Sequence, residues 1–252
     1  MKSLIIGRGE VGEALFEVVR PYHSTFIRDV GECDLPSVEV MHICFPDSDD
    51  FIDEVKRYQQ KYKPNLTIIH SSVAVGTTEE IGGRIVYSPI RGRHRPKLSV
   101  ELKFFPKFIA CSNKRDSDVA VAYFKECGWD VFTTRDIVGT ELVKMLSNIH
   151  MGVEIAWAQE VDRILKHFKG NPSTYEKWEE SYNAGYFRVL QPHMMRPIMR
   201  PDPIGGHCIL ECIEILRQQF SSPIFEFVRS SNEEVKKNHI QKNGKGSIEI
   251  RT

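Results

Sequence analysis

The sequence predicts an α/β fold, in which a mostly parallel sheet is covered by helices, followed by a helical domain built on one long helix. Three observations lead to this prediction. Short apolar runs alternate with helical patterns through residues 1–138, which is typical of a parallel sheet with helices on both faces. The first apolar run ends in a glycine-rich turn. From residue 139 the strand signals stop, so we expect a helical domain over 139–240 and a polar tail over 241–252.

The strands and helices can be placed from apolar runs and from apolar residues at spacings of three and four. The predicted strands are residues 3–6, 24–28, 38–45, 66–70, 84–87, 108–110 and 130–132. The predicted helices are residues 11–19, 49–62, 116–127, 140–169, 175–186 and 209–220. Pro64 ends the second of these helices, and Gly170 with Pro172 ends the fourth.

The helix predicted over 140–169 has an apolar stripe and would be about 43 Å long at 1.5 Å per residue. That length exceeds the width of a small domain, so part of the stripe needs a second surface to cover it. We therefore expect a homodimer in which this helix packs on the partner subunit.

Composition and charge exclude several classes of protein. Hydrophobic residues make up 41% of the 252 residues, which is inconsistent with a wholly disordered chain. Lys and Arg total 34, as do Asp and Glu, so the basic excess of a nucleic-acid binder is absent. No apolar run could span a membrane, and the one at the N-terminus is too short for a signal peptide. We expect a cytoplasmic protein with no nucleic-acid or membrane partner.

The six cysteines are scattered through the chain and lack the density of a disulfide framework, which indicates a reducing compartment. Cys208 and Cys212 form the only close pair in the sequence. No second pair completes a zinc site, so we predict no metal.

The first candidate site is the motif Gly7-Arg8-Gly9-Glu10-Val11-Gly12, which follows a strand and opens a helix. Gly7 permits the tight turn, Gly9 lets the backbone approach a pyrophosphate, and Gly12 allows close packing of helix on strand. Glu10 and Val11 begin the helix, whose N-terminus favours a phosphate. The motif predicts a Rossmann-type dinucleotide-binding domain, and the alternative is a glycine turn without a ligand.

The type of cofactor depends on the end of the second strand, about 20 residues further on. Asp29 would bind the adenosine ribose of NAD, whereas Arg28 would bind the extra phosphate of NADP. We expect NAD, with NADP as the alternative.

Small hydroxyl residues follow the fourth strand in the segment His70–Thr78. Ligands of open α/β sheets bind at the carboxyl ends of strands, which makes Ser72 and Thr77 candidates for cofactor contacts. The alternative is a helix cap made by Thr77 or Thr78, with Glu80 in the first turn.

Two candidate groups lie in the helical domain. Lys144 and Asn148 are four residues apart and share one helix face, where an ammonium and an amide could stabilise an oxyanion. The alternative is an ordinary exposed pair. Cys208 follows Gly205-Gly206-His207 and begins an apolar helix, and a helix N-terminus stabilises a thiolate. The alternative for this cysteine is a buried small hydrophobe, the role we expect for Cys212.

The four motifs GRGEVG, SSVAVGTT, TELVKMLSN and PIGGHCI occur in the order and approximate spacing of one family. The chain resembles the UDP-glucose/GDP-mannose dehydrogenases, especially the branch acting on UDP-N-acetyl-mannosamine. The resemblance implies NAD, a dimer-forming helical domain, and oxidation of an alcohol to a carboxylate through a thiohemiacetal on cysteine. It implies that Cys208 is the nucleophile, that Lys144 and Asn148 stabilise the oxyanion and hold water, and that Ser72 and Thr77 lie beside the nicotinamide.

The chain departs from the family pattern at two carboxylates and in length. Ile90 stands where the family has a glutamate after Ser-Pro, and Cys212 stands where it has an aspartate. The resemblance also implies a third, nucleotide-sugar-binding domain, which we expect this chain to lack and a separate subunit to be able to supply. A basic loop around the position of the missing glutamate could hold a phosphate or carboxylate, with a solvated loop as the alternative. Its residues are Arg91, Arg93, His94, Arg95 and Lys97.

These features predict an NAD(P)-dependent oxidoreductase that oxidises an alcohol of an anionic substrate, with a sugar nucleotide among the candidates. The substrate would contact Arg91, Arg93 and Arg95 together with Gly205-Gly206-His207. The alternative is a catalytically altered scaffold or sensor that binds a dinucleotide.

Overall fold

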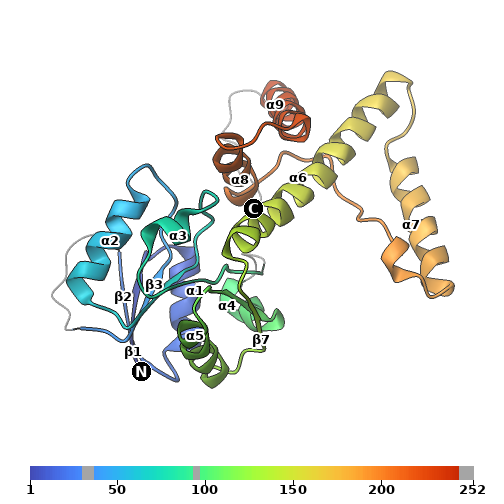
Figure 1. Cartoon of the computed structure of the whole chain (residues 1–252). Helices are drawn as coiled ribbons and strands as arrows, with labels where there is room; N and C mark the ends of the chain where they lie inside the picture. Colours follow the sequence, from blue (N-terminus) through green and yellow to red (C-terminus); the bar gives the residue numbers. More distant parts are fainter. Residues whose placement is uncertain (30–36, 93–96, 244–252) are drawn as a thin grey trace. The chain divides into compact units, whose positions relative to one another are not determined.

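The computed structural model describes residues 1–29, 37–92 and 97–243 (Figure 1). The chain forms two compact units, Met1–Lys144 and Met145–Thr252, which are described separately below. The division falls inside a long helix, six residues beyond the boundary predicted at 138/139.

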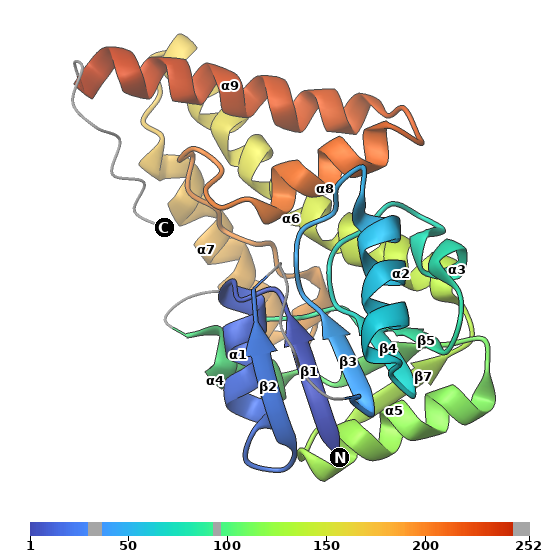
Figure 2. The ribbon, with the colours of Figure 1, turned by 90° about the vertical axis from the view of Figure 1, so that its left-hand side faces the viewer.

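The first unit contains a seven-stranded sheet in the order β2-β1-β3-β4-β5-β6-β7 (Figure 2). The strands are β1 (Lys2–Ile6), β2 (Ser24–Arg28), β3 (Val40–Ile43), β4 (Leu66–Ile69), β5 (Ile85–Tyr87), β6 (Lys107–Ala110) and β7 (Val131–Thr134). Neighbouring strands are parallel except for β5 and β6. The predicted α/β fold with a mostly parallel sheet is confirmed. β6 and β7 run against the other strands, and Ala110 at the end of β6 pairs with Tyr87 at the end of β5.

Helices cover both faces of this sheet. They are α1 (Glu10–Val19), α2 (Phe51–Tyr62), α3 (Thr77–Ile81), α4 (Leu98–Glu101) with the 3₁₀ turn η1 (Leu102–Phe104), and α5 (Lys114–Glu126). The sequence did not predict α4 or η1 and gave a helix at Thr77–Thr78 only as an alternative, because helices this short present too few turns for a periodic pattern.

Alternation along the strands divides the core into two layers. Ile5 belongs to the layer that contains residues of α1, α4 and α5. Leu4 and Ile6 point the other way, into the layer that contains residues of α2 and α3. β1 is therefore buried on both faces, as expected for a parallel strand between two helical layers.

The second unit is helical. The helix α6 (Ile137–His167) begins in the first unit and continues into the second from Met145 onward. It is followed by α7 (Ser173–Arg188), the 3₁₀ turn η2 (Pro192–Met194), α8 (Cys208–Arg217) and α9 (Pro223–Asn243). The prediction missed α9, which continues to Asn243, three residues into the stretch expected to be a polar tail. A proline at the first helical position and the buried Phe225 and Val228 explain why α9 forms.

A glycine sets the distance between α6 and the helices beside it. A Cβ added to Gly152 would lie 2.7 Å from Ile209 Cγ2 and 3.2 Å from Val228 Cγ1. Any larger residue at this position would push α6 away from α8 and α9. Across the described ranges of the chain, no helix combines the length and apolarity that crossing a membrane requires.

Candidate functional site

The order of the sheet places the glycine motif at the point where open α/β folds have a ligand-binding crevice. β1 lies between β2 and β3, and the chain passes from β1 to α1 on one face but from β3 to α2 on the other. In open α/β sheets, ligands bind at the carboxyl ends of the strands where the connections diverge in this way. Gly7 is the residue directly after β1, so the motif begins at the carboxyl end of this strand.

The three glycines of the motif differ in what surrounds them. Gly7 has a φ of +101°, and a Cβ there would lie 2.7 Å from the backbone of Cys44 and Phe45. A Cβ on Gly12 would overlap the carbonyl oxygen of Gly7. Gly9, in contrast, has no atom within 4 Å of the position of a Cβ. The fold therefore needs Gly7 and Gly12, whereas Gly9 leaves open space in front of α1.

That open space lies at the N-terminus of α1. Gly9 occupies the N-cap position and has no side chain with which to cap the helix, and Glu10 and Val11 form its start. The first-turn N–H groups and the helix dipole favour an anion here. The residues present thus fit a pyrophosphate.

At the end of β2, Arg28 and Asp29 have different surroundings. Arg28 is half-buried, and its guanidinium donates hydrogen bonds to the Tyr62 hydroxyl at 3.0 Å and to the backbone oxygen of Asp29 at 3.2 Å. Asp29 is exposed. Arg28 therefore has partners within the chain, while the Asp29 side chain is accessible to a ribose.

The segment after β4 is fixed at both ends. Ser71 donates a hydrogen bond to the backbone oxygen of Phe45 at 2.6 Å, and Ser72 beside it is half-buried. Thr77 is buried as the first residue of α3. The alternative in which Thr77 or Thr78 caps α3 is wrong, because Gly76 occupies the N-cap position with a φ of +97°.

The carboxylate of Glu141 in α6 takes the place of that cap. It accepts hydrogen bonds from the N–H groups of Gly76 at 2.7 Å and Thr78 at 2.9 Å. The sequence carried no sign of this contact between distant residues.

The candidate catalytic residues fall in both units. Lys144 is half-buried in α6 and belongs to the first unit with the glycine motif, whereas Asn148 and Cys208 belong to the second. The Asn148 amide donates a hydrogen bond to the Cys212 sulfur at 3.4 Å. Asn148 thus contacts the position at which the resemblance implies an aspartate.

Cys208 is half-buried and is the first residue of α8, while Cys212 one turn later is fully buried. Gly205, Gly206 and His207 before it are exposed.

The chain leading to Cys208 is anchored on two helices. The Gln159 amide donates to the backbone oxygen of Asp202 at 2.8 Å, and the N–H of Ile204 donates to the Asn232 side chain at 2.7 Å. These bonds hold the entry to the glycine turn, so the start of α8 has a defined position within the second unit.

The basic loop is described only in part, because Arg93, His94 and Arg95 lie outside the described residues. The Arg91 guanidinium lies over the rings of Phe105 and Phe108, with 5.2 Å and 5.4 Å to the centroids. Lys97 forms an ion pair with Glu17 at 2.9 Å. Arg91 and Lys97 therefore both have partners within the chain.

Near this loop, the structure contains a buried polar chain that sequence reasoning missed. His70 Nε2 lies 3.0 Å from His42 Nδ1, and His42 Nε2 lies 2.9 Å from the Tyr123 hydroxyl. His70 Nδ1 lies 2.5 Å from the backbone oxygen of Ser88, which can only accept. If both histidines are neutral, each hydrogen bond has a defined direction: Tyr123 donates to His42, His42 to His70, and His70 to Ser88.

Lys107 lies at the end of this chain with no acidic partner among the described residues. It is 4% exposed, and its amine donates to the backbone oxygens of Ser88 at 3.0 Å and Pro89 at 3.2 Å. The third neighbour of the nitrogen is His70 Nδ1, at 3.4 Å. A neutral amine suits these neighbours, because it has two N–H donors for the two backbone oxygens and one lone pair that faces His70 Nδ1. Burial lowers the pKa of Lys107 to about 7 and that of His42 to about 3.

Ile90 is buried in the core layer beside α5. Its side chain is apolar, and the titratable groups that bind the backbone oxygens of the preceding Ser88-Pro89 are Lys107 and His70.

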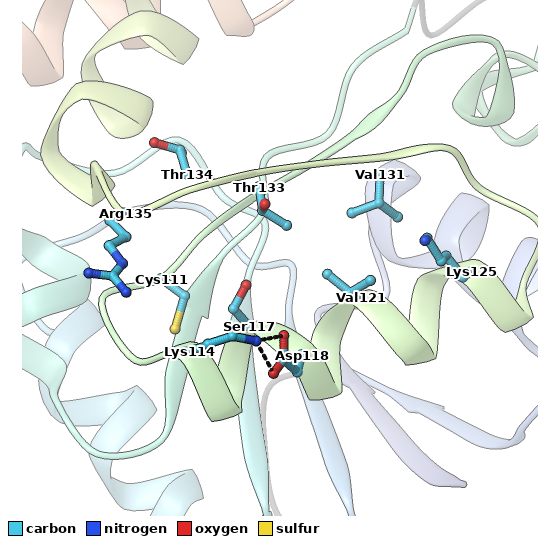
Figure 3. A pocket seen from close by; sticks show the side chains of 10 residues that line it. All are labelled: Cys111, Lys114, Ser117, Asp118, Val121, Lys125, Val131, Thr133, Thr134 and Arg135. Atoms are coloured by element: carbon cyan, nitrogen blue, oxygen red, sulfur yellow. Dashed lines mark hydrogen bonds and ion pairs between the residues drawn. The ribbon is translucent and has the colours of Figure 1, made fainter.

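A groove of about 520 Å³ lies between α5 and the edge strand β7 (Figure 3). Its lining includes Cys111, Lys114, Asp118, Thr134 and Arg135, and Lys114 forms an ion pair with Asp118 at 2.7 Å. In the strand order, β3, β4, β5 and β6 lie between β7 and β1, the strand that leads into the glycine motif. The groove is therefore separate from the predicted dinucleotide site. Among the residues that the structure describes, no cluster could hold a metal ion.

Comparison with known proteins agrees with the resemblance of the motifs. The chain is 26% identical over 151 residues to UDP-N-acetyl-D-mannosamine dehydrogenase of Methanococcus maripaludis. The matched region covers 58% of this chain and 33% of that protein. The enzyme of the same name from Methanococcus vannielii is also 26% identical, over 152 residues. The chain thus spans about a third of the length of the curated relatives it matches. No protein-family model matches the chain.

Solved structures share the fold over almost the whole chain. UDP-D-ManNAc dehydrogenase of Pyrococcus horikoshii has a TM-score of 0.74 at 17% identity. The match covers 96% of this chain and 72% of the Pyrococcus chain. The 3-hydroxyisobutyrate dehydrogenase of Mycobacterium tuberculosis has a TM-score of 0.63 at 10% identity. The match covers 94% of this chain and 93% of that structure's chain. The predicted Rossmann-type domain followed by helices is confirmed by these neighbours. In sequence and in fold, the chain is similar to UDP-N-acetylmannosamine dehydrogenases.

Proposed function

We propose that this chain is an NAD-dependent oxidoreductase that oxidises an alcohol of an anionic substrate, with a UDP-sugar as the first candidate. The observation that carries the proposal is the glycine motif, where Gly9 leaves open space at the N-terminus of α1 beside the crevice of the sheet. The sequence similarity to UDP-N-acetyl-D-mannosamine dehydrogenases supports the class of substrate.

In this proposal the first unit binds the dinucleotide. The N–H groups at the start of α1 hold the pyrophosphate, Asp29 accepts hydrogen bonds from the adenosine ribose, and Ser72 and Thr77 contact the nicotinamide half. NAD, when bound, supplies the hydride acceptor. NAD is preferred over NADP because the Arg28 guanidinium is already bonded to Tyr62 and to the backbone.

Lys144 and Asn148 act on the reacting oxygen of the substrate. The Lys144 amine takes the hydroxyl proton, and Asn148 donates a hydrogen bond to the same oxygen. Two carboxylates that the resemblance implies are replaced by Ile90 and Cys212, and proton-handling groups contribute about 10²–10⁴ each in rate. The remaining residues suit the two-electron step from alcohol to aldehyde, in which Cys208 contacts the substrate.

The second unit supports the proposal of a homodimer. Trp178 in α7 is 59% exposed, and Phe187 is 69% exposed. Within the described part of α7, Glu179 is the one buried residue. A helix with this much exposed aromatic surface is suited to packing against another subunit.

Calorimetry with NADH and NADPH tests the cofactor proposal. Wild-type protein is expected to bind NADH more tightly, and Asp29→Ala to lose that preference, whereas Arg28→Ala keeps it. Loss of NADPH binding alone in Arg28→Ala would reverse the assignment. If neither cofactor binds, the oxidoreductase proposal is wrong.

The scaffold alternative is favoured by Ile90 and Cys212, and a test of turnover separates it from an enzyme. Formation of NADH would be followed with UDP-N-acetyl-mannosamine and with small 3-hydroxy acids, using Lys144→Met as the matched control. Turnover that depends on Lys144 supports an enzyme. Tight NADH binding without turnover on either class of substrate supports the scaffold.

A further inference from the structure

Glu141 is a fully buried carboxylate whose two oxygens both bind backbone. Oε2 accepts from the N–H of Gly76 at 2.7 Å, and Oε1 accepts from the N–H of Thr78 at 2.9 Å. In the part of the chain that the structure describes, no basic side chain forms an ion pair with it. Burial raises the pKa of Glu141, and hydrogen bonds from Thr78 and from the backbone of Gly76 oppose that rise. The hydrogen bonds of the 76–78 turn thus compensate for burying this group.

Capping α3 does not by itself require a buried acid from another helix. A Ser or Asp at the N-cap position would bond the same N–H groups locally and remain near solvent. Here Gly76 occupies that position, and the acceptor comes from a residue 65 positions later in the chain. α3 has five residues, too few to be stable alone, so its start depends on Glu141.

The other end of the segment is attached near the glycine motif. Ser71 bonds the backbone oxygen of Phe45 at 2.6 Å, and the N–H of Ala74 donates to the Asp47 carboxylate at 3.2 Å. The backbone of Phe45 also borders the position of a Cβ on Gly7. Residues 71–78 therefore connect the crevice beside the glycine motif to the first turns of α6.

We propose that Glu141 is a positioning residue that holds the segment 71–78 against α6, so that the nicotinamide half of the dinucleotide meets Ser72 and Thr77 in a fixed place. Lys144 lies one turn after Glu141 on the same helix, so the clamp also ties the segment to the turn that carries the amine. This inference rests on the proposed function, because it assumes that the crevice binds a dinucleotide.

The proposal predicts different effects of Glu141 on the binding of the two halves of the dinucleotide. The adenosine half would bind to the glycine motif and Asp29, which Glu141 does not contact. Glu141→Gln keeps the size of the side chain but directs an NH₂ group at one of the two N–H donors. The variant is expected to bind NADH about tenfold more weakly, which corresponds to 1.4 kcal/mol, and to bind ADP-ribose as wild type does.

Titration calorimetry with NADH and ADP-ribose on the full chain measures this difference. The matched control is Glu80→Gln, which removes the same charge from the exposed side of α3. Loss of NADH affinity alone in Glu141→Gln, with no change in Glu80→Gln, supports the proposal. Equal loss for both ligands, or no loss for either, overturns it while leaving the proposed function intact. Wild-type protein that binds neither ligand overturns the proposed function, and the positioning role with it.

Hydrogen exchange of the wild-type protein provides a test that does not depend on folding of a variant. The amides of Gly76 and Thr78 are expected to exchange slowly, since both donate to a buried carboxylate. Saturating NADH should slow exchange in residues 71–78 further, and saturating ADP-ribose should not. The same protection with both ligands would contradict a role for the segment at the nicotinamide half.

Discussion

Replacing single glycines of the GRGEVG motif is expected to separate binding from folding. Gly9→Val should abolish NADH binding and leave the protein folded, because nothing lies within 4 Å of a Cβ at this position. The N-cap φ of −80° is also accessible to valine. The valine methyl groups would fill the space that a pyrophosphate needs, while stability changes by no more than about 1 kcal/mol.

Gly12→Ala should have the opposite effect. Its Cβ would overlap the carbonyl oxygen of Gly7, and neither group is on a flexible side chain, so α1 would have to move away from β1. Overpacking of this kind costs about 3 kcal/mol. For a protein of this size, that cost corresponds to a fall in the Tm of about 6–12 °C.

Thermal unfolding followed by circular dichroism, and calorimetry with NADH and NADPH, measure the two effects. Gly185→Val is the matched control, since a Cβ on Gly185 in α7 also meets nothing within 4 Å and lies outside the motif. Unchanged affinity for both cofactors in Gly9→Val would show that the motif is not a pyrophosphate site. A Tm for Gly12→Ala equal to that of wild type would refute the packing argument.

Four further outcomes are expected. Gly152→Ala should lower the stability of the second unit by about 1–3 kcal/mol in chemical unfolding, since its Cβ would lie 2.7 Å from Ile209 Cγ2; a neutral effect would mean that α8 can shift. Burial lowers the pKa of Lys107 to about 7, so the unfolded chain binds more protons between about pH 7 and 10.5, and this group makes stability rise with pH there. Lys107→Met should remove that rise, by up to a few kcal/mol in urea unfolding, and a pH profile identical to wild type would contradict the burial argument. Cys208, half-buried at the start of α8, should alkylate faster at neutral pH than Cys212, and bound NADH should protect it; mass spectrometry that finds it inert favours the scaffold. Sedimentation should find a dimer, and a monomer at every concentration would rule out the proposed assembly.

Features that depend on neighbouring residues were predictable from the sequence. The strand before Gly7, the helix after Gly9 and the long helix that includes Lys144 follow from apolar periodicity and glycine spacing, which are local properties. The observed ends of the helices differ from the predicted ends by a few residues, because capping and fraying determine where a helix ends. α9 was missed, and its mean hydropathy is low for a helix that buries Phe225.

The tertiary structure alone decided which polar groups meet. Glu141 reaches Gly76 across 65 residues, and His42 reaches Tyr123 across 81, and no spacing in the sequence encodes either contact. Lys107 opens a strand and would be expected at the surface, yet the antiparallel pairing of β5 with β6 places its amine under the backbone of Ser88. A residue type and its neighbours specify local conformation, whereas burial and partners depend on how distant segments pack. For that reason the sequence by itself determined the fold class and the position of the glycine motif, and only the packed chain determined the Glu141 clamp and the buried amine.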